Sequence, residues 1–185
     1  INESFDDDSA LFTSYGEKVL SVNGSKSNLK ITDKEDLDIF KSLKKGKTFI
    51  GVGFDIHRLV EKRKLYLGGV RIPFHLGLKG HSDADPVLHS VIDSLLGACR
   101  LGDIGKLFSN KNKKYKNIRS TILLKKVIEL IKSKNFFINN IDINIIVQNP
   151  KINKYSKKMI QTISKLCEIN PNQINIKGKT TEKLG

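Results

Sequence analysis

The chain has 185 residues, a formal net charge of +14 and only two cysteines. This length predicts a single domain. Cys99 and Cys167 are too few for a disulfide framework, so we expect both to be buried thiols on helix faces in a reducing compartment. No apolar run approaches the roughly 20 residues of a membrane-spanning helix, so no membrane partner is expected.

The charge is unevenly distributed along the chain. Residues 1–40 hold nine acidic side chains and four lysines, whereas residues 41–185 hold 29 basic and ten acidic side chains. A basic body of this kind is typical of proteins that meet polyanions, whether nucleic acid, a membrane surface or a phosphorylated ligand. Much of the lysine lies in Lys-Asn runs such as 111–117, which we interpret as solvated surface.

Residues 1–47 are a polar extension that precedes the first predicted strand. Its Ser, Asn, Asp and Lys content predicts poor order, apart from a short helix over 33–40. We interpret the extension as the remnant of a leader, and residues 48–185 as the folded domain.

The domain begins with β-type signals. The β-branched, aromatic and glycine-rich segment 48–55 predicts a strand. Residues 64–67 and 70–73 predict the two arms of a hairpin joined at Gly68-Gly69. Asp85-Pro86 then predicts a helix start, with Asp85 as N-cap, and apolar residues at helical spacing continue to Cys99.

Helices and strands alternate in the second half. The apolar spacing predicts helices over 120–133 and 156–167, and strands over 141–147 and 174–177. This order indicates an α+β fold, a single domain with helices packed on one face of a mixed β-sheet.

Three of the four histidines lie in two blocks, Gly-Phe-Asp-Ile-His at 53–57 and His-Ser-Asp-Ala-Asp-Pro-Val-Leu-His at 81–89. Asp55 and His57 would point to one face of the strand, and His89 lies in the first turn of the helix. Two histidines and one aspartate leave one position open on tetrahedral zinc, which is typical of catalytic sites.

A carboxylate one helical turn from His89, either Asp85 or Asp93, would hold the second ring nitrogen of that histidine. The alternative is that His57 and His89 are ordinary, partly buried histidines on separate elements. We expect His75, which follows Pro73-Phe74, to lie in a loop or on the surface.

At this point the chain resembles the 2-C-methyl-D-erythritol 2,4-cyclodiphosphate synthases of the non-mevalonate isoprenoid pathway. Besides the two histidine blocks, the resemblance rests on Gly-Gly-Val-Arg-Ile-Pro at 68–73, Leu-Gly-Asp-Ile-Gly-Lys-Leu-Phe at 101–108, Gln-Asn-Pro-Lys at 148–151 and Thr-Thr-Glu-Lys-Leu-Gly at 180–185. Several blocks in the right order are specific where any one alone is not.

The resemblance implies a phosphoryl transfer within one substrate. In this family the 2-phosphate of 4-diphosphocytidyl-2-C-methyl-D-erythritol 2-phosphate attacks the β-phosphorus, and CMP leaves. No protein nucleophile is needed, which agrees with the lack of a convincing Ser-His or Cys-His pair. The protein contributes positioning and charge neutralisation.

The resemblance also assigns metal and catalytic roles. Asp55, His57 and His89 match zinc ligands, and Glu182 matches a ligand of a second divalent ion, Mg²⁺ or Mn²⁺. His81 and Thr180 match the catalytic pair. The implied contacts to the cytidine-diphosphate-linked substrate are Asp55, His57, His81, Ser82, Asp103, Ile104, Gly105, Val147, Lys151, Ile152, Thr180, Thr181 and Glu182.

Family members form homotrimers with active sites between subunits, so we expect the same here. The chain departs from the family pattern at Lys179 and Asn110, and members usually continue beyond a position equivalent to Gly185. Extensions like 1–47 occur on plastid-targeted members, so the resemblance implies a plastid location, an apicoplast or chloroplast stroma, with a bacterial-type cytoplasm as the alternative.

Two other functions are consistent with parts of the sequence. The basic body would suit a nucleic-acid-binding protein, although Trp is absent and no nucleic-acid module is recognised. A zinc-dependent phosphohydrolase would use water at the open metal position, with Asp85 or Glu182 as general base. Both rank below the synthase, which needs no nucleic-acid partner.

Overall fold

The computed structural model describes residues 8–20, 22–24, 30–43, 46–109 and 111–182. Two compact units divide at Lys47 and Thr48. The first unit carries helices α1 (Asp8–Ser14) and α2 (Lys34–Leu43). Helix α2 confirms the helix expected near 33–40, and Asp33 caps it by accepting the Asp36 N–H at 2.8 Å. Helix α1 was not predicted.

The hairpin of the second unit has the predicted position. Strands β2 (Leu65–Leu67) and β3 (Val70–Ile72) pair antiparallel, with Leu65 opposite Ile72. The connecting Gly68 and Gly69 have φ values of +58° and +78°, which suit a tight two-residue turn. The inward side chains of both strands are buried in the core.

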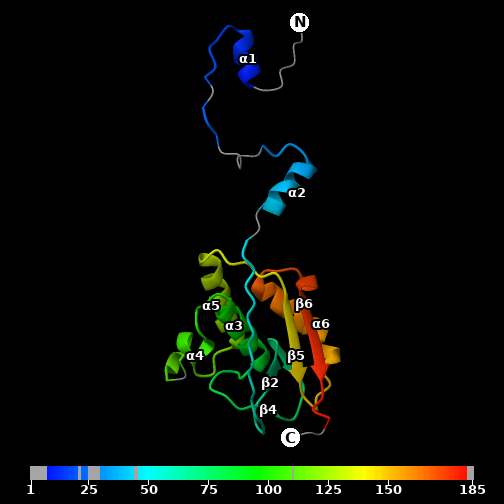
Figure 1. Cartoon of the computed structure of the whole chain (residues 1–185). Helices are drawn as coiled ribbons and strands as arrows, with labels where there is room; N and C mark the ends of the chain where they lie inside the picture. Colours follow the sequence, from blue (N-terminus) through cyan, green and yellow to red (C-terminus); the bar gives the residue numbers. More distant parts are fainter. Residues whose placement is uncertain (1–7, 21, 25–29, 44–45, 110, 183–185) are drawn as a thin grey trace. The chain divides into compact units, whose positions relative to one another are not determined.

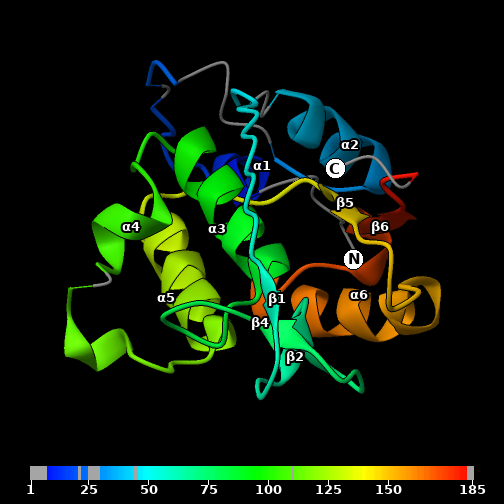
Figure 2. The ribbon, with the colours of Figure 1, turned by 90° about the horizontal axis from the view of Figure 1, so that it is seen from below.

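Three helices form most of the core. Helices α3 (Pro86–Ala98) and α5 (Ser120–Ser133) confirm the predicted spans, and α6 (Asn153–Cys167) begins three residues earlier than predicted because its first turn is polar. Helix α3 packs against α5, and α5 packs against α6. Figures 1 and 2 show α3 and α5 side by side. Leu88, Ile92, Leu124, Met159 and Ile163 are among the fully buried side chains.

Strands β5 (Ile141–Ile146) and β6 (Ile174–Lys179) pair in parallel and are connected through α6 and the short 3₁₀ helix η2 (Pro171–Gln173). Alternate β5 residues are buried, as expected for a strand with one face on helices. Helix α6 packs against β6 (Figure 1). This arrangement confirms the α+β class.

The strand predicted over 48–55 is wrong, since this segment belongs to no strand. Side-chain exposure still alternates with a period of two from Gly51 to His57, as it does along a strand. The alternation of faces is therefore as predicted, but the segment pairs with no strand in the part of the chain that the structure describes. Among the described residues, the sheets are three two-stranded pieces: β2 with β3, β5 with β6, and β1 (Leu59–Val60) with β4 (Gly77–Leu78). Two short helices, α4 (Ile104–Leu107) and the 3₁₀ helix η1 (Lys113–Tyr115), complete the unit.

Candidate metal centre

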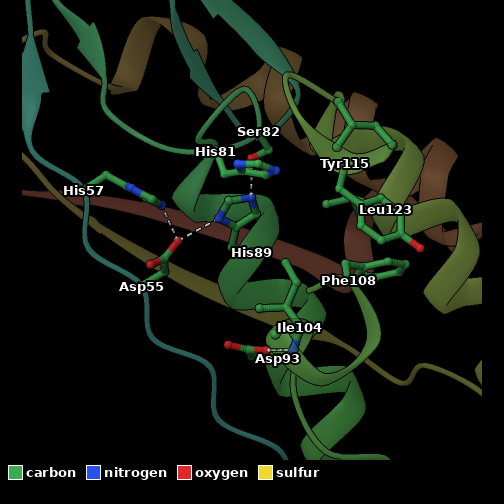
Figure 3. A pocket seen from close by; sticks show the side chains of 12 residues that line it. Asp55, His57, His81, Ser82, His89, Asp93, Ile104, Phe108, Tyr115 and Leu123 are labelled. Atoms are coloured by element: carbon green, nitrogen blue, oxygen red, sulfur yellow. Dashed lines mark hydrogen bonds and ion pairs between the residues drawn. The ribbon is translucent and has the colours of Figure 1, made fainter. Parts of the chain in front are cut away.

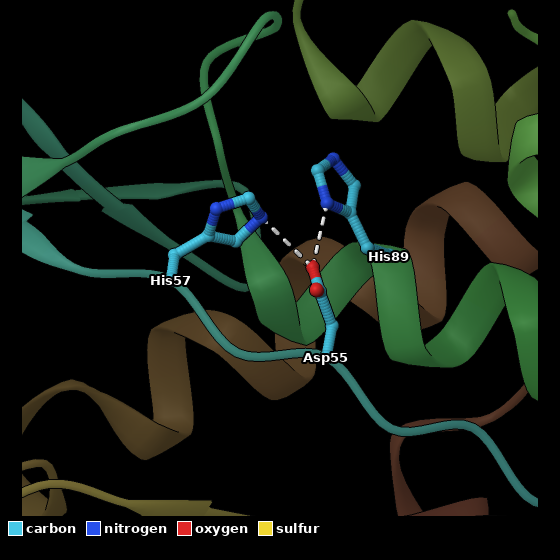
Figure 4. A group of neighbouring side chains, drawn as sticks. All are labelled: Asp55, His57 and His89. Atoms are coloured by element: carbon cyan, nitrogen blue, oxygen red, sulfur yellow. Dashed lines mark hydrogen bonds and ion pairs between the residues drawn. The ribbon is translucent and has the colours of Figure 1, made fainter.

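Asp55, His57 and His89 converge at the start of α3. Asp55 Oδ2 lies 3.0 Å from His57 Nε2 and 2.8 Å from His89 Nδ1. One ligand atom from each side chain falls within 4.8 Å of the others. Figure 4 shows both imidazoles turned toward the same carboxylate oxygen. The structure thus brings together the three residues that the sequence nominated as metal ligands.

Close backbone contact holds Asp55 and His57 against α3. A Cβ atom added to Gly53 would lie 1.8 Å from the Ser90 carbonyl oxygen, and one added to Gly51 would lie 1.9 Å from the Ser94 carbonyl oxygen. Only glycine permits so close an approach between two backbones. The glycines therefore decide where the side chains at 55 and 57 meet His89.

Each histidine is also held from its far side. His57 Nδ1 lies 2.7 Å from the Lys79 carbonyl oxygen, and since a carbonyl only accepts, Nδ1 must carry the proton. His89 Nε2 lies 2.9 Å from Ser120 Oγ and 3.3 Å from Ser82 Oγ. Outer contacts of this kind are typical of metal-bound histidines, because they fix the ring and leave the other nitrogen for the metal.

The expected partner of His89 was wrong. Asp85 is fully buried, but its carboxylate accepts the N–H groups of Gly68, Gly69, Val87 and Leu88. Asp93 Oδ1 accepts the Ile104 N–H at 2.7 Å. Both carboxylates are occupied by backbone donors, so neither reaches the imidazole.

Electrostatics at the triad favour a cation. Burial by itself raises the pKa of Asp55, but the hydrogen bonds and charges of His57 and His89 outweigh it and hold that pKa well below its usual value. The hydrogen bond to Asp55 raises the pKa of His57 against the opposing effect of burial. The carboxylate is therefore an anion that faces two nitrogen atoms.

A pocket opens beside the triad, as Figure 3 shows. His81, Ser82, Ile104 and Gly105, which the resemblance nominated as substrate contacts, line it together with the triad. His81 Nε2 is buried, and no described residue forms a hydrogen bond with it. Further lining residues were not predicted: Asp93, Phe108, Tyr115, Ile118 and Leu123. They come from α3, the end of α4, η1, the loop before α5, and α5 itself, so segments far apart in the sequence build this part of the pocket.

The other nominated residues lie outside this pocket. Asp103 is the N-cap of α4 and accepts the Lys106 N–H at 2.8 Å, so it acts as a turn former in this structure. A second group surrounds the ends of β5 and β6, where the Val147 N–H donates to the Lys179 carbonyl and Thr180 is hydrogen-bonded to Glu182. That group comprises Val147, Lys151, Ile152, Thr180, Thr181 and Glu182. Asn110 lies outside the described residues.

The remaining sequence expectations are met in part. His75 is exposed, as expected for a loop or surface residue, and its ring lies tilted against that of Phe74. Cys167 is buried, whereas Cys99 is only half-buried at the end of α3. No helix in the described part of the chain is long and apolar enough to cross a membrane.

These features define a protein class: an α+β domain with a candidate Asp-His-His metal centre in a pocket that polar and apolar side chains line together. Residues 48–185 match the YgbB family. The chain belongs to this family, and its resemblance to the cyclodiphosphate synthases is confirmed.

Individual relatives agree with this assignment. The chain is 54% identical over 136 residues to a 2-C-methyl-D-erythritol 2,4-cyclodiphosphate synthase from Clostridium novyi, covering 74% of the chain and 87% of the relative. It is 56% identical over 184 residues to a bifunctional enzyme IspD/IspF from Pelagibacter ubique, covering 100% of the chain and 48% of the relative. The chain thus spans about half the length of the bifunctional relatives it matches. A solved structure of Plasmodium falciparum IspF in complex with CDP superposes with a TM-score of 0.64 at 45% identity, covering 74% of the chain and 84% of that structure.

Proposed function

We propose that this chain converts 4-diphosphocytidyl-2-C-methyl-D-erythritol 2-phosphate into 2-C-methyl-D-erythritol 2,4-cyclodiphosphate and CMP. An oxygen of the 2-phosphate forms a bond to the β-phosphorus. The bond from that phosphorus to the bridging oxygen breaks, and its electron pair leaves with CMP. The observation that carries the proposal is the convergence of Asp55, His57 and His89 beside a pocket that also holds His81 and Ser82.

We propose that the triad holds Zn²⁺. Nitrogen and carboxylate donors in this number suit a catalytic zinc site with one position left for substrate. The fit has a physical test within the structure: once Nδ1 carries the proton of the neutral His57 ring, Nε2 and Asp55 Oδ2 are both acceptors, yet they lie 3.0 Å apart. Two acceptors approach so closely only with a cation between them, either a proton or a metal. Bound zinc would neutralise charge on a phosphate oxygen during the transfer.

The pocket residues would position the substrate phosphates. The buried His81 Nε2 and the Ser82 hydroxyl face the same pocket as the triad. A phosphate oxygen would supply the acceptor or donor partner that His81 lacks among the described residues. Holding the 2-phosphate in line with the β-phosphorus is the main contribution that this reaction asks of a protein.

Glu182, Thr180 and Thr181 would act on the diphosphate from the second group. A carboxylate with phosphate oxygens is a suitable ligand set for Mg²⁺ or Mn²⁺. These residues do not line the triad pocket of their own chain. We therefore propose that they contact a substrate bound in the triad pocket of a neighbouring subunit. Val147, Lys151 and Ile152 are proposed to contact the nucleotide from this second group. Lys179 at the end of β6 and Asp103 at the start of α4 are proposed to contact it as well.

We propose that the protein assembles as a homotrimer. Ile50, Val52, Phe54 and Ile56 alternate along the segment that belongs to no strand, and each is at least 75% exposed. A row of large apolar side chains on an unpaired chain segment is costly in water and is typical of a surface that another subunit covers.

The relatives that match the whole chain are bacterial and give the plastid expectation no support. They favour the bacterial alternative. They also align through residues 1–47, so we propose that this extension corresponds to a segment of the bifunctional enzymes rather than to a leader remnant.

Product identity tests the proposed function. The purified chain is incubated with the diphosphocytidyl substrate and Mg²⁺, and the products are separated by chromatography and ³¹P NMR. We expect equal amounts of CMP and the cyclodiphosphate. Release of CMP with an opened diphosphate would instead indicate a zinc phosphohydrolase, and a folded trimer that released no CMP would contradict the proposal.

A further inference from the structure

A chain of polar side chains runs from His89 away from the triad into the core. Ser120 Oγ lies 2.9 Å from His89 Nε2 and donates to Asp83 Oδ1 at 2.5 Å. Ser120 is fully buried at the start of α5, and Asp83 is buried in the loop that precedes α3. Asp83 Oδ1 also accepts the Ser120 N–H at 3.1 Å. The hydroxyl is thus held at a fixed place between a carboxylate and an imidazole.

Arg119 is the last member of this series of polar side chains and contacts Asp83. Its Nε lies 2.9 Å from Asp83 Oδ2, an ion pair that is not aligned as a hydrogen bond. The guanidinium also donates to the Gly69 carbonyl at 3.1 Å and lies 3.9 Å above the Tyr66 ring. Three separate contacts therefore hold the guanidinium beside Asp83.

The direction of each hydrogen bond follows from these partners. A carboxylate only accepts, so the Ser120 hydroxyl must donate to Asp83. The serine oxygen then has only lone pairs left for His89, so His89 Nε2 must be the donor. The proton of the neutral imidazole is thereby fixed on Nε2. Nδ1, 2.8 Å from Asp55 Oδ2, is then the nitrogen left for a metal ion or a second proton.

We propose that Ser120 and Asp83 are positioning residues that fix the proton of His89 on Nε2 and so reserve Nδ1 for the metal. The inference rests on the metal centre of the proposed function. Ser82, which lies 3.3 Å from the same nitrogen, is a weaker second acceptor because its oxygen already accepts the Ala84 N–H.

Asp83→Asn reverses the direction of the hydrogen bonds between residue 83, Ser120 and His89, and it keeps a side chain of nearly the same size. The Arg119 cation attracts the amide oxygen of the new side chain and turns its NH₂ group toward Ser120, which also leaves the Ser120 N–H without the acceptor that it has in the wild type. The Ser120 hydroxyl would then donate to His89 Nε2, which moves the imidazole proton to Nδ1. Asp142→Asn is a matched control, because Asp142 pairs with Lys177 on the exposed face of β5.

Two measurements test the proposal without an activity assay. In the ¹¹³Cd²⁺-loaded, ¹⁵N-histidine-labelled chain, we expect the cadmium to couple to Nδ1 of His89. Chelator competition should give a zinc Kd that is about 10–100-fold weaker for Asp83→Asn and for Ser120→Ala, and unchanged for Asp142→Asn. Circular dichroism and thermal unfolding establish that each variant folds, and Ser120→Thr, which keeps the hydroxyl, should recover part of the affinity.

Cadmium coupling through Nε2, or wild-type zinc affinity in folded Asp83→Asn and Ser120→Ala, would overturn the inference. A wild-type chain that bound no zinc would overturn this inference and the proposed metal centre together. Zinc bound through Nδ1 by a chain that forms no cyclodiphosphate would leave the inference standing and contradict the proposed function alone.

Discussion

Gly53 passes the Ser90 carbonyl so closely that a single added methyl group would lie 1.8 Å from that oxygen. This contact joins a segment that belongs to no strand to the helix that carries His89. Two ligands of the candidate metal centre, Asp55 and His57, lie just beyond Gly53 on the same segment. The metal centre therefore depends on a contact between two stretches of backbone, not only on its three side chains.

Gly53→Ala should weaken zinc binding, because the methyl group must push residues 53–57 away from α3. We expect the zinc Kd to rise at least about tenfold, the low end of the loss seen when a group that orients a metal ligand is removed. Gly97→Ala, in the same helix as Ser90, is the control, because a Cβ at Gly97 would meet no neighbouring atom within 4 Å. That variant should bind zinc normally and gain up to about 1 kcal/mol of stability. Equal zinc affinity in the two variants would refute the role of the contact.

Asp85→Ala should destabilise the fold by about 2–4 kcal/mol, since it removes a helix cap and leaves four N–H donors without their acceptor. Urea unfolding measures the change. Asp85→Asn should cost less, because an amide oxygen can still accept from Gly68, Val87 and Leu88. If Asp85→Ala unfolded with the wild-type midpoint, the carboxylate would have no structural role.

Val52→Asp should prevent assembly. Val52 is 87% exposed in the single chain, so a charge there has little effect on the fold of one subunit but must be desolvated in a trimer. Sedimentation equilibrium should give a trimer for the wild type and a monomer for the variant. Phe137→Asp, at an equally exposed apolar residue outside the row, is the control. A trimer that persisted in Val52→Asp would place the subunit interface elsewhere.

The two cysteines should differ in their reaction with a thiol reagent. Burial raises the pKa of Cys167 to about 12, and a smaller degree of burial also raises the pKa of the half-buried Cys99. Because the thiolate is the reactive form, both rates increase with pH, and Cys167 should stay unreactive near pH 8. We expect one thiol to react in the native chain and two in guanidinium chloride. Loss of the native reaction in Cys167→Ser rather than in Cys99→Ser would contradict the assignment.

Local signals in the sequence were sufficient for much of the fold. Helix α3 was predictable because Asp85, Pro86 and the following apolar spacing all lie within one short stretch. The hairpin was predictable because the Gly68-Gly69 turn fixes its register. The pairing of 48–55 was not, since an alternating pattern specifies a face but not a neighbour.

The candidate site shows the same limit. The ligands were identifiable because Asp55 and His57 are two residues apart and His89 follows a helix cap. The contact between His89 and Ser120 joins residues 31 apart on two helices, and no spacing rule relates them. Sequence reasoning instead chose Asp85 and Asp93, which share a helix face with His89 but are occupied by backbone N–H groups.

Zinc content per chain tests the central claim most directly. The wild type and the variants Asp55→Ala, His89→Ala and His75→Ala are loaded with zinc, freed of excess metal and analysed by mass spectrometry for metal content. We predict one zinc ion per chain in the wild type and in His75→Ala, where the histidine is exposed and not part of the triad. We predict much less than one in Asp55→Ala and His89→Ala. An unchanged zinc content in folded Asp55→Ala and His89→Ala would show that these residues do not form the metal centre.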